Sequence, residues 1–194
     1  GLTVTKLSPD GKVLLTIGTP GQRGDDETHF NSPSDVITAP NGDIFVTDGH
    51  APIAPIIPAG LNMRVMKFDA KGKFIKQWGK AGSGPSEFNN PHALGLDNKG
   101  RLYVADRVNN RIQSFKPDGT YLNEVLLASG AGFDKGCGGM TPNGCGISPD
   151  GKIVYAAESM SAHLLAFDIV DEGEVARAPG LFQGRTVASP GGNT

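Results

Sequence analysis

The sequence predicts an all-β fold, a β-propeller made of four-stranded antiparallel blades. The first observation is a line of sequence that occurs three times, beginning at Pro33, Pro91 and Pro142; such recurrence at a period of about 40–60 residues is typical of propeller blades. The second is composition, because 28 Gly and 14 Pro in 194 residues favour short strands and tight turns. The third is that no stretch has the apolar periodicity of a helix.

Each repeat opens with a predicted β-hairpin. A short apolar strand leads to a turn whose second residue is glycine, at Gly42, Gly100 and Gly151, and a second strand follows. Such turns accept the positive φ angles that tight hairpins require. The second strand ends on an acidic residue in every repeat, which favours a turn-bonding or capping role over catalysis. These acids are Asp48, Asp106 and Glu158.

A second hairpin completes each predicted blade. Its first strand begins at Arg64, Arg111 or His163. Apolar and polar residues alternate in the following strand, as in Lys73–Trp78, which indicates packing on at least one side. The opening of the chain, TVTKLSPDGKVLLTIG, matches only this outer half of a blade. We therefore predict one propeller domain over residues 1–194, comprising a partial blade at 1–31, blades at about 32–88, 89–138 and 139–180, and a tail at 181–194.

The predicted ring is incomplete. Three and a half blades are fewer than most propellers contain, and open ends would leave exposed strand edges, which proteins avoid. The chain is therefore expected to be a fragment or part of a six-bladed ring, or to form a homodimer that completes the ring; a four-bladed ring closed by the tail is the remaining alternative. The apolar stretch HAPIAPIIPAGLNM from His50 is expected near a mouth of the ring, in an interface, or packed on the next blade.

Charge and composition indicate which classes of partner and which location to expect. A net charge of −2, with 18 Lys and Arg scattered along the chain, argues against nucleic-acid binding. No apolar run reaches the ~18–20 residues of a membrane span. The sequence shows no leader, and a removed leader is consistent with a secreted or periplasmic protein. Cys137 and Cys145 then either form a disulfide or remain two idle thiols.

The segment RLYVADRVNNRIQSF from Arg101 resembles the NHL repeats of β-propellers. Over residues 14–126 the chain also resembles peptidyl-α-hydroxyglycine α-amidating lyase, the enzyme domain that completes C-terminal amidation of peptides. The matching segments are IGTPGQRGDDETHFNSPSDV, FVTDGH, MKFDAKGKFIKQWG, EFNNPHALGL and VADRVNNRIQSF. This resemblance implies a metal-dependent lyase that cleaves a C–N bond.

The resemblance also implies a site. The lyase family binds zinc through three histidines, each just after the proline that opens a blade, and His92 matches one of them. Ser34 holds the equivalent position in the preceding blade, where the family usually has Ser or Thr. Asn143 stands where the third zinc histidine is expected, and the first would belong to a blade before residue 1. His50 stands where the family has its catalytic tyrosine and is expected to act as a base. Arg107 matches a functional arginine and is expected either to clamp a carboxylate or to form a salt bridge to a neighbouring blade.

The last third of the chain points to a different metal. TPNGCGISPDGKIVYAAESMSAHLLAFDI resembles the gluconolactonase and senescence-marker propellers, whose Pro-Asn-Gly motif supplies a calcium ligand. That ligand would be Asn143, and the second carboxylate of the family falls in the region of Glu158 and Ser159. Oxygen donors of this kind suit hard cations. The expected cofactor is therefore zinc, calcium or both.

Three functions follow from these observations. The first is a lyase-like metalloenzyme acting on a small molecule or peptide in the central channel. The second is a non-catalytic NHL module that binds a protein or peptide, and the third is a calcium-dependent lactonase. His29, His163 and Arg64 are expected to have structural roles only.

Overall fold

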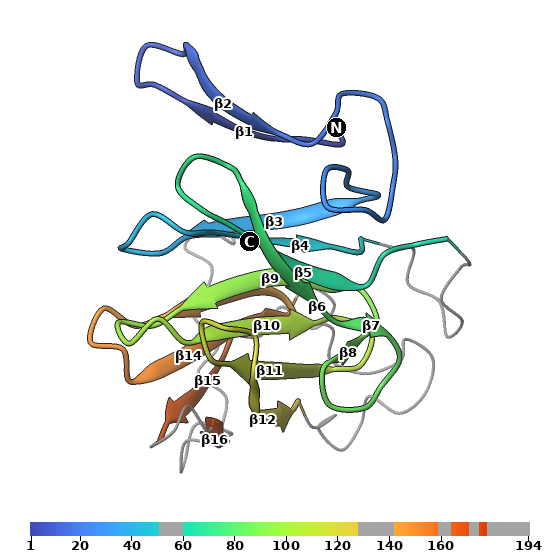
Figure 1. The fold of residues 1–194 in the computed structure, drawn as a ribbon. Coiled ribbons are helices and arrows are strands. Elements are labelled where there is room, and N and C mark those ends of the chain that lie inside the picture. Colours follow the sequence, from blue (N-terminus) through green and yellow to red (C-terminus); the bar gives the residue numbers. More distant parts are fainter. Residues whose placement is uncertain (51–59, 128–141, 159–163, 171–174, 178–194) are drawn as a thin grey trace, which may run out of the picture.

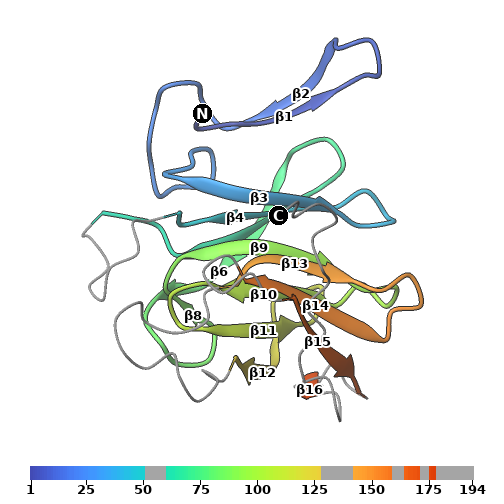
Figure 2. The same ribbon diagram turned by 180° about the vertical axis from the view of Figure 1, so that it is seen from behind.

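The computed structural model describes residues 1–50, 60–127, 142–158, 164–170 and 175–177, and all of its elements are strands. A two-stranded hairpin is followed by three four-stranded antiparallel sheets, which confirms the predicted all-β blade architecture (Figure 1). The sheets stack in chain order, and each presents a broad side to the next (Figure 2). In the described part of the chain, no helix is long and apolar enough to cross a membrane.

Each blade follows the chain order of its strands. The hairpin contains β1 (Val4–Leu7) and β2 (Val13–Ile17). The first full blade contains β3 (Pro33–Thr38), β4 (Ile44–Asp48), β5 (Arg64–Phe68) and β6 (Phe74–Trp78). The second contains β9 (Pro91–Leu96), β10 (Leu102–Asp106), β11 (Arg111–Phe115) and β12 (Tyr121–Leu126). The third contains β13 (Pro142–Ile147), β14 (Ile153–Glu158), β15 (Leu164–Ile169) and β16 (Val175–Arg177). A short parallel pair, β7 (Lys80–Ala81) and β8 (Glu87–Phe88), links the first two blades.

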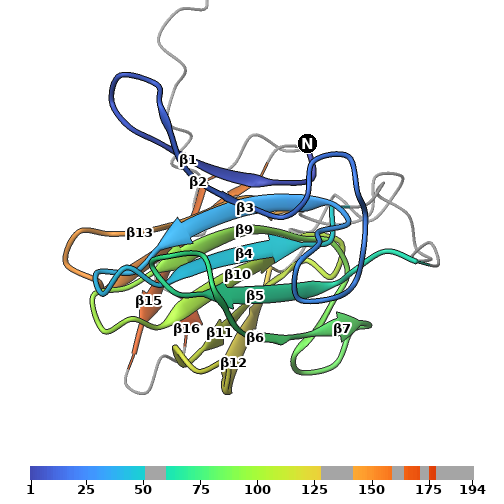
Figure 3. The same cartoon turned by 45° about the horizontal axis from the view of Figure 1, so that its top comes forward.

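The first strand of each blade lies on the inside of the stack. Strand β9 packs against both β3 and β13, and the three strands run side by side (Figure 3). Residues on these inner strands therefore meet across blade boundaries, although they are about 50 residues apart in sequence. This arrangement brings together the residues that open successive repeats.

The core lies between the sheets rather than inside any one of them. One apolar cluster fills each boundary between neighbouring blades, and strands β4 and β10 are buried at every position. In β10, Val104 packs toward the first blade and Tyr103 toward the third. Because each buried side chain of this size contributes about 1.5–3 kcal/mol, stacking of the sheets is the main source of stability.

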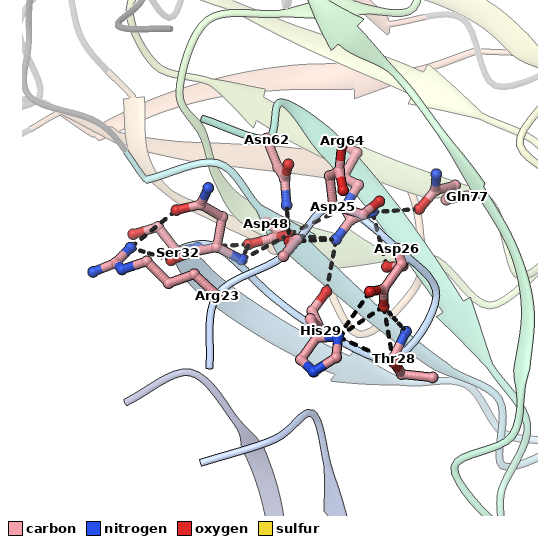
Figure 4. A network of polar contacts seen from close by, with 12 residues as sticks. Arg23, Asp25, Asp26, Thr28, His29, Ser32, Asp48, Asn62, Arg64 and Gln77 are labelled. Carbon is pink, nitrogen blue, oxygen red and sulfur yellow. Dashed lines mark hydrogen bonds and ion pairs between the residues drawn. The ribbon is translucent and has the colours of Figure 1, made fainter. Parts of the chain in front are cut away.

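A buried carboxylate anchors the entry to the inner strand of each of the first two full blades. The carboxylate of Asp48, at the end of β4, accepts hydrogen bonds from the backbone N–H of Asn31 (3.0 Å) and Ser32 (2.7 Å). It also accepts from Asn62 Nδ2 (2.7 Å) and forms an ion pair with Arg64 (3.0 Å). Figure 4 shows the resulting network around Asp48. The groups that donate to this carboxylate are backbone N–H groups and the side chains of Asn62 and Arg64, which hold the loop and the neighbouring strand in place.

The same network recurs one blade later. Asp106 accepts hydrogen bonds from the backbone N–H of Asn89 (2.7 Å) and from Asn109 Nδ2 (2.8 Å), and pairs with Arg111 Nε at 2.8 Å. The predicted structural role is thus confirmed for Asp48, Asp106 and Arg64. The side chain of Glu158 and residue His163 lie outside the described residues.

Other predictions concern individual segments. His29 is tied to its own loop, since its ring Nδ1 contacts Asp26 at 2.8 Å and its carbonyl accepts a hydrogen bond from Arg64, which confirms the structural role expected for it. Cys145 carries a free thiol. Cys137 and the apolar residues 51–59 lie outside the described residues.

Candidate functional site

The second residue of each inner strand, directly after the opening proline, interrupts the regular strand pairing. In the first blade, pairing passes from Pro33 to Asp35 and omits Ser34. The same step omits His92 in the second blade and Asn143 in the third. Each is therefore a bulged residue, and bulges often aim a side chain out of the regular sheet at a functional site. The backbone therefore confirms that Ser34, His92 and Asn143 occupy equivalent positions in the three repeats.

Two of these bulges are in direct contact. His92 Nδ1 lies 2.9 Å from the carbonyl oxygen of Asn143. A carbonyl can only accept, so Nδ1 carries the hydrogen and Nε2 of the neutral ring keeps its lone pair. Burial lowers the pKa of His92, as do the neighbouring Arg107 and His50, whereas the bond to Asn143 and the charge of Asp35 oppose this change. The lowered pKa favours the neutral form of His92, in which Nε2, bonded to none of the described residues, offers its lone pair to a metal ion or a proton.

His50 reaches the same place from the loop after β4. Its ring lies against that of His92, with a centroid distance of 5.3 Å and an angle of 52°. The backbone N–H groups of Gly49 and His50 both donate to the carbonyl of Ser32, at 3.0 and 2.9 Å. A side chain at Gly49 would collide with the neighbouring backbone and with Pro91. The loop that positions His50 is therefore fixed by close packing, while the ring itself is exposed.

Arg107 lies in the corresponding loop of the second blade. Its backbone N–H donates to the carbonyl of Asn90 at 3.0 Å, and its charge is close enough to His92 to lower the pKa of that ring. The guanidinium Nε is buried, and none of the described residues accepts a hydrogen bond from it. The predicted salt bridge to a neighbouring blade is not formed with any described carboxylate. The arginine therefore retains capacity for an anionic ligand.

The structure thus brings all four predicted site residues to one end of the inner strands. It also adds Asp35, which the repeat pattern does not single out. The Asp35 carboxylate accepts a hydrogen bond from Leu94 N–H (2.8 Å) across the blade boundary, and its charge acts on both His92 and Cys145. An acidic residue within a predicted inner strand, next to Val36 and Ile37, is the signal that could have identified it.

The site contains only part of a metal-binding donor set. Among the described residues, no group of three or more His, Cys, Asp or Glu side chains could hold a metal ion. His92 nevertheless has the arrangement of a ligand, because metal-binding histidines commonly donate their second N–H to a carbonyl. The side-chain oxygen of Asn143 is buried and has no hydrogen-bond partner in the described part of the chain. These two residues fit part of a metal site.

Comparison with known proteins identifies relatives of the sequence. A family model described as a 6-bladed beta-propeller matches residues 55–132. Human NHL repeat-containing protein 3 is 34% identical over 164 residues, covering 81% of this chain and 42% of that protein. Mouse peptidyl-glycine alpha-amidating monooxygenase is 42% identical over 135 residues, covering 65% of this chain and 13% of that protein. A probable peptidyl-alpha-hydroxyglycine alpha-amidating lyase of Caenorhabditis elegans is 40% identical over 107 residues, or 54% of this chain and 28% of that protein.

Solved structures give the same fold. The periplasmic gluconolactonase of Pseudomonas aeruginosa aligns with a TM-score of 0.62 and 17% identity, covering 92% of this chain and 49% of that one. A streptogramin B lyase aligns with a TM-score of 0.57 and 21% identity, covering 90% and 46%. At these identities the likeness shows the fold alone. The resemblances to NHL repeats and to the amidating lyases are confirmed, and the chain spans less than half the length of these curated relatives.

Proposed function

We propose that this NHL-type β-propeller is a metal-dependent enzyme of the amidating-lyase kind, which cleaves a C–N bond in a small molecule or peptide held at the mouth of the central channel. The observation that carries the proposal is the contact between His50 and His92, with ring centroids 5.3 Å apart. Two neighbouring imidazoles, beside an arginine whose Nε has no partner among the described residues, provide a metal donor, a base and an anion-binding group in one place.

The residues take separate roles in this proposal. His92 Nε2 and the Asn143 side chain would hold the metal ion, and a zinc ion bound there would supply Lewis-acid activation of a substrate hydroxyl. His50, exposed and adjacent, would accept the hydroxyl proton and return it to the leaving amide nitrogen as the C–N bond breaks and the hydroxyl carbon becomes an aldehyde. Arg107, whose Nε has no partner among the described residues, would bind a substrate carboxylate and so orient the bond that breaks.

The proposal extends to assembly and location. We infer a homodimer, or a longer chain, that supplies the blades absent from these 194 residues, because isolated ends would expose strand edges. A secreted or periplasmic location is part of the same proposal.

Metal analysis tests the proposal. The protein is purified without chelators or a histidine tag, and its metal content is measured by mass spectrometry for wild type and for His92→Ala, with His29→Ala as the matched histidine control. We expect about one zinc per chain or per dimer, lost in His92→Ala only, together with release of amide from peptides ending in α-hydroxyglycine. Zinc content equal in all three proteins would refute the role of His92.

A non-catalytic module is the second candidate. It is favoured by the similarity to NHL repeat-containing protein 3, which extends over 81% of the chain, and by Asn143 standing where the lyase family has a zinc histidine. Absence of bound metal, combined with capture of an unmodified peptide, would support it.

A calcium-dependent lactonase is the third candidate. Its specific observation is the side-chain oxygen of Asn143, which is buried and has no partner among the described residues, as expected for a hard-cation ligand. Calcium retained by His92→Ala but lost by Asn143→Ala, with hydrolysis of a sugar lactone, would favour this activity over the lyase.

A further inference from the structure

A second polar site lies at the other end of the inner strands, remote from the histidines. His92 is near the start of β9 and Asp97 directly follows its end, so about 16 Å separates the two along an extended strand. Here a hollow of about 430 Å³ lies between the β9–β10 turn and the β13–β14 turn. A smaller hollow of about 260 Å³ adjoins it on the outer side, and Lys99 and Arg101 line both.

Arg101 is the fixed element of this site. Its side chain is only 10% exposed, and its Nε lies 2.6 Å from Oδ2 of the fully buried Asp97. The same carboxylate accepts the backbone N–H groups of Lys99 (2.9 Å) and Arg101 (2.8 Å). No described residue accepts a hydrogen bond from either Nη group of Arg101. The guanidinium is therefore held through Nε, its Nη groups have no acceptor among the described residues, and the side chain lines both hollows.

The Asp97–Arg101 pair is not part of the repeat. The first blade has Ala39 and Asp43 at these two positions, and the third has Ser148 and Lys152. Three blades fold the same turn with different residues, so the turn itself does not need a buried Asp–Arg pair. Burying such a pair costs desolvation free energy, which suggests a role in recognition.

The charges around Arg101 favour an anion. Lys99 and Lys152 line the larger hollow, and Lys116 lines the smaller one. The single carboxylate in these walls, Asp150, is occupied by Ser148 Oγ (2.6 Å) and by the backbone N–H of Lys152 (3.1 Å). These hydrogen bonds lower its pKa, so it stays ionised and compensates only part of the positive charge.

The larger hollow also has an apolar wall, formed by Ile169 and the exposed Val170. We propose that this hollow binds an organic oxyanion, a phosphate ester or carboxylate, whose anionic head contacts Arg101 between Lys99 and Lys152 and whose apolar part rests on Ile169 and Val170. Planar guanidinium donors suit such heads because they can bond two oxygens at once. The site is independent of the proposed lyase chemistry.

The chain offers a matched control. The turn Ser8–Lys12 has the same sequence, Ser-Pro-Asp-Gly-Lys, as Ser148–Lys152 and the same serine-to-aspartate bond, but Lys12 does not line the hollow. Titration with phenyl phosphate, inorganic phosphate and acetate at low ionic strength is followed by calorimetry and by the amide shifts of Gly100 and Gly151. The double variant Lys99→Ala/Lys152→Ala is compared with Lys12→Ala/Lys71→Ala, which loses the same charge from exposed turns.

We expect phenyl phosphate to bind more tightly than inorganic phosphate. The Lys99→Ala/Lys152→Ala variant should bind it roughly tenfold or more weakly than the wild type, while the affinity of the control variant stays near that of the wild type. Preference for acetate over phosphate would identify a carboxylate head instead. Arg101→Lys, which retains a cation beside Asp97, should also weaken binding through loss of the planar fork. Equal weakening in the two double variants, or no amide shift in the wild type with any of the three anions, would overturn the proposal.

Discussion

His92 Nδ1 and the carbonyl oxygen of Asn143 lie 2.9 Å apart, although the two residues open different blades. Each is the bulged residue of its inner strand, so one backbone irregularity, repeated one blade apart, produces the contact. The bond fixes which nitrogen of His92 carries the hydrogen and leaves the other for chemistry.

The first prediction concerns the ionisation of His92. Because burial and the nearby Arg107 lower its pKa, nuclear magnetic resonance titration should give a value below that of an ordinary histidine, about 6.5. A His92 pKa at or above 6.5 would mean that the ring is more hydrated than its contacts indicate.

The free energy of unfolding should depend on the protonation of His92. A histidine with a lowered folded pKa is protonated first in the unfolded state, so the free energy of unfolding falls as pH drops below about 6.5 and is unaffected above it. Urea unfolding at pH 7.5 and pH 5.5 should show a smaller loss in His92→Gln than in the wild type. An equal loss in both proteins would assign the pH dependence to other groups.

The second prediction concerns the buried network around Asp106. Arg111→Met removes the partner of a carboxylate that is 0% exposed, and an uncompensated buried charge costs about 3–5 kcal/mol. In contrast, Lys80→Ala breaks a largely exposed pair with Glu87 and should cost less than about 1 kcal/mol. Chemical denaturation measures both.

The pH dependence of that variant has a defined sign. Burial raises the pKa of Asp106 to about 6, and a raised carboxyl pKa gives stability that is lost as pH rises through this value. The cost of Arg111→Met should therefore be smaller at pH 5 than at pH 8, since protonation removes the unpaired charge. A cost that grows toward low pH would contradict this interpretation.

The third prediction concerns the thiol of Cys145. Burial, together with the charge of Asp35, raises its pKa to about 12, and the thiolate is the reactive form. Alkylation of native protein at pH 8, mapped by peptide mass spectrometry, should leave Cys145 unmodified until denaturant is added. Rapid labelling of the native protein would indicate that the inner strands open readily.

The fourth prediction uses the equivalence of the bulges. Asn143→His places a second imidazole in the bulge next to His92, and histidine is a better zinc ligand than an amide. Zinc affinity measured by calorimetry should rise by roughly tenfold or more. The control is Asn98→His, an exposed turn position outside the site, which should leave the affinity unchanged.

Some features of this protein follow from the sequence because they depend on local chemistry and repetition. Glycine at the second turn position, as in Gly42 and Gly100, adopts the positive φ that a tight hairpin needs. The recurring acids at Asp48 and Asp106 indicate a scaffold role, since a catalytic group has no reason to recur in every blade. The bulge equivalence of His92 and Asn143 could likewise be predicted from alignment of the repeats.

Other features depend on how the sheets stack. The ring contact of His50 with His92 joins two blades, and no local pattern specifies the distance between loops held by different sheets. Likewise, the sequence alone determined that Asp97 and Arg101 stand four residues apart, but not that the carboxylate is buried and the Nη groups remain available. Only the tertiary structure decided this. The neighbouring blade, rather than the local sequence, determines how deeply a side chain is buried, and burial determines how strongly its charge interacts with other charges.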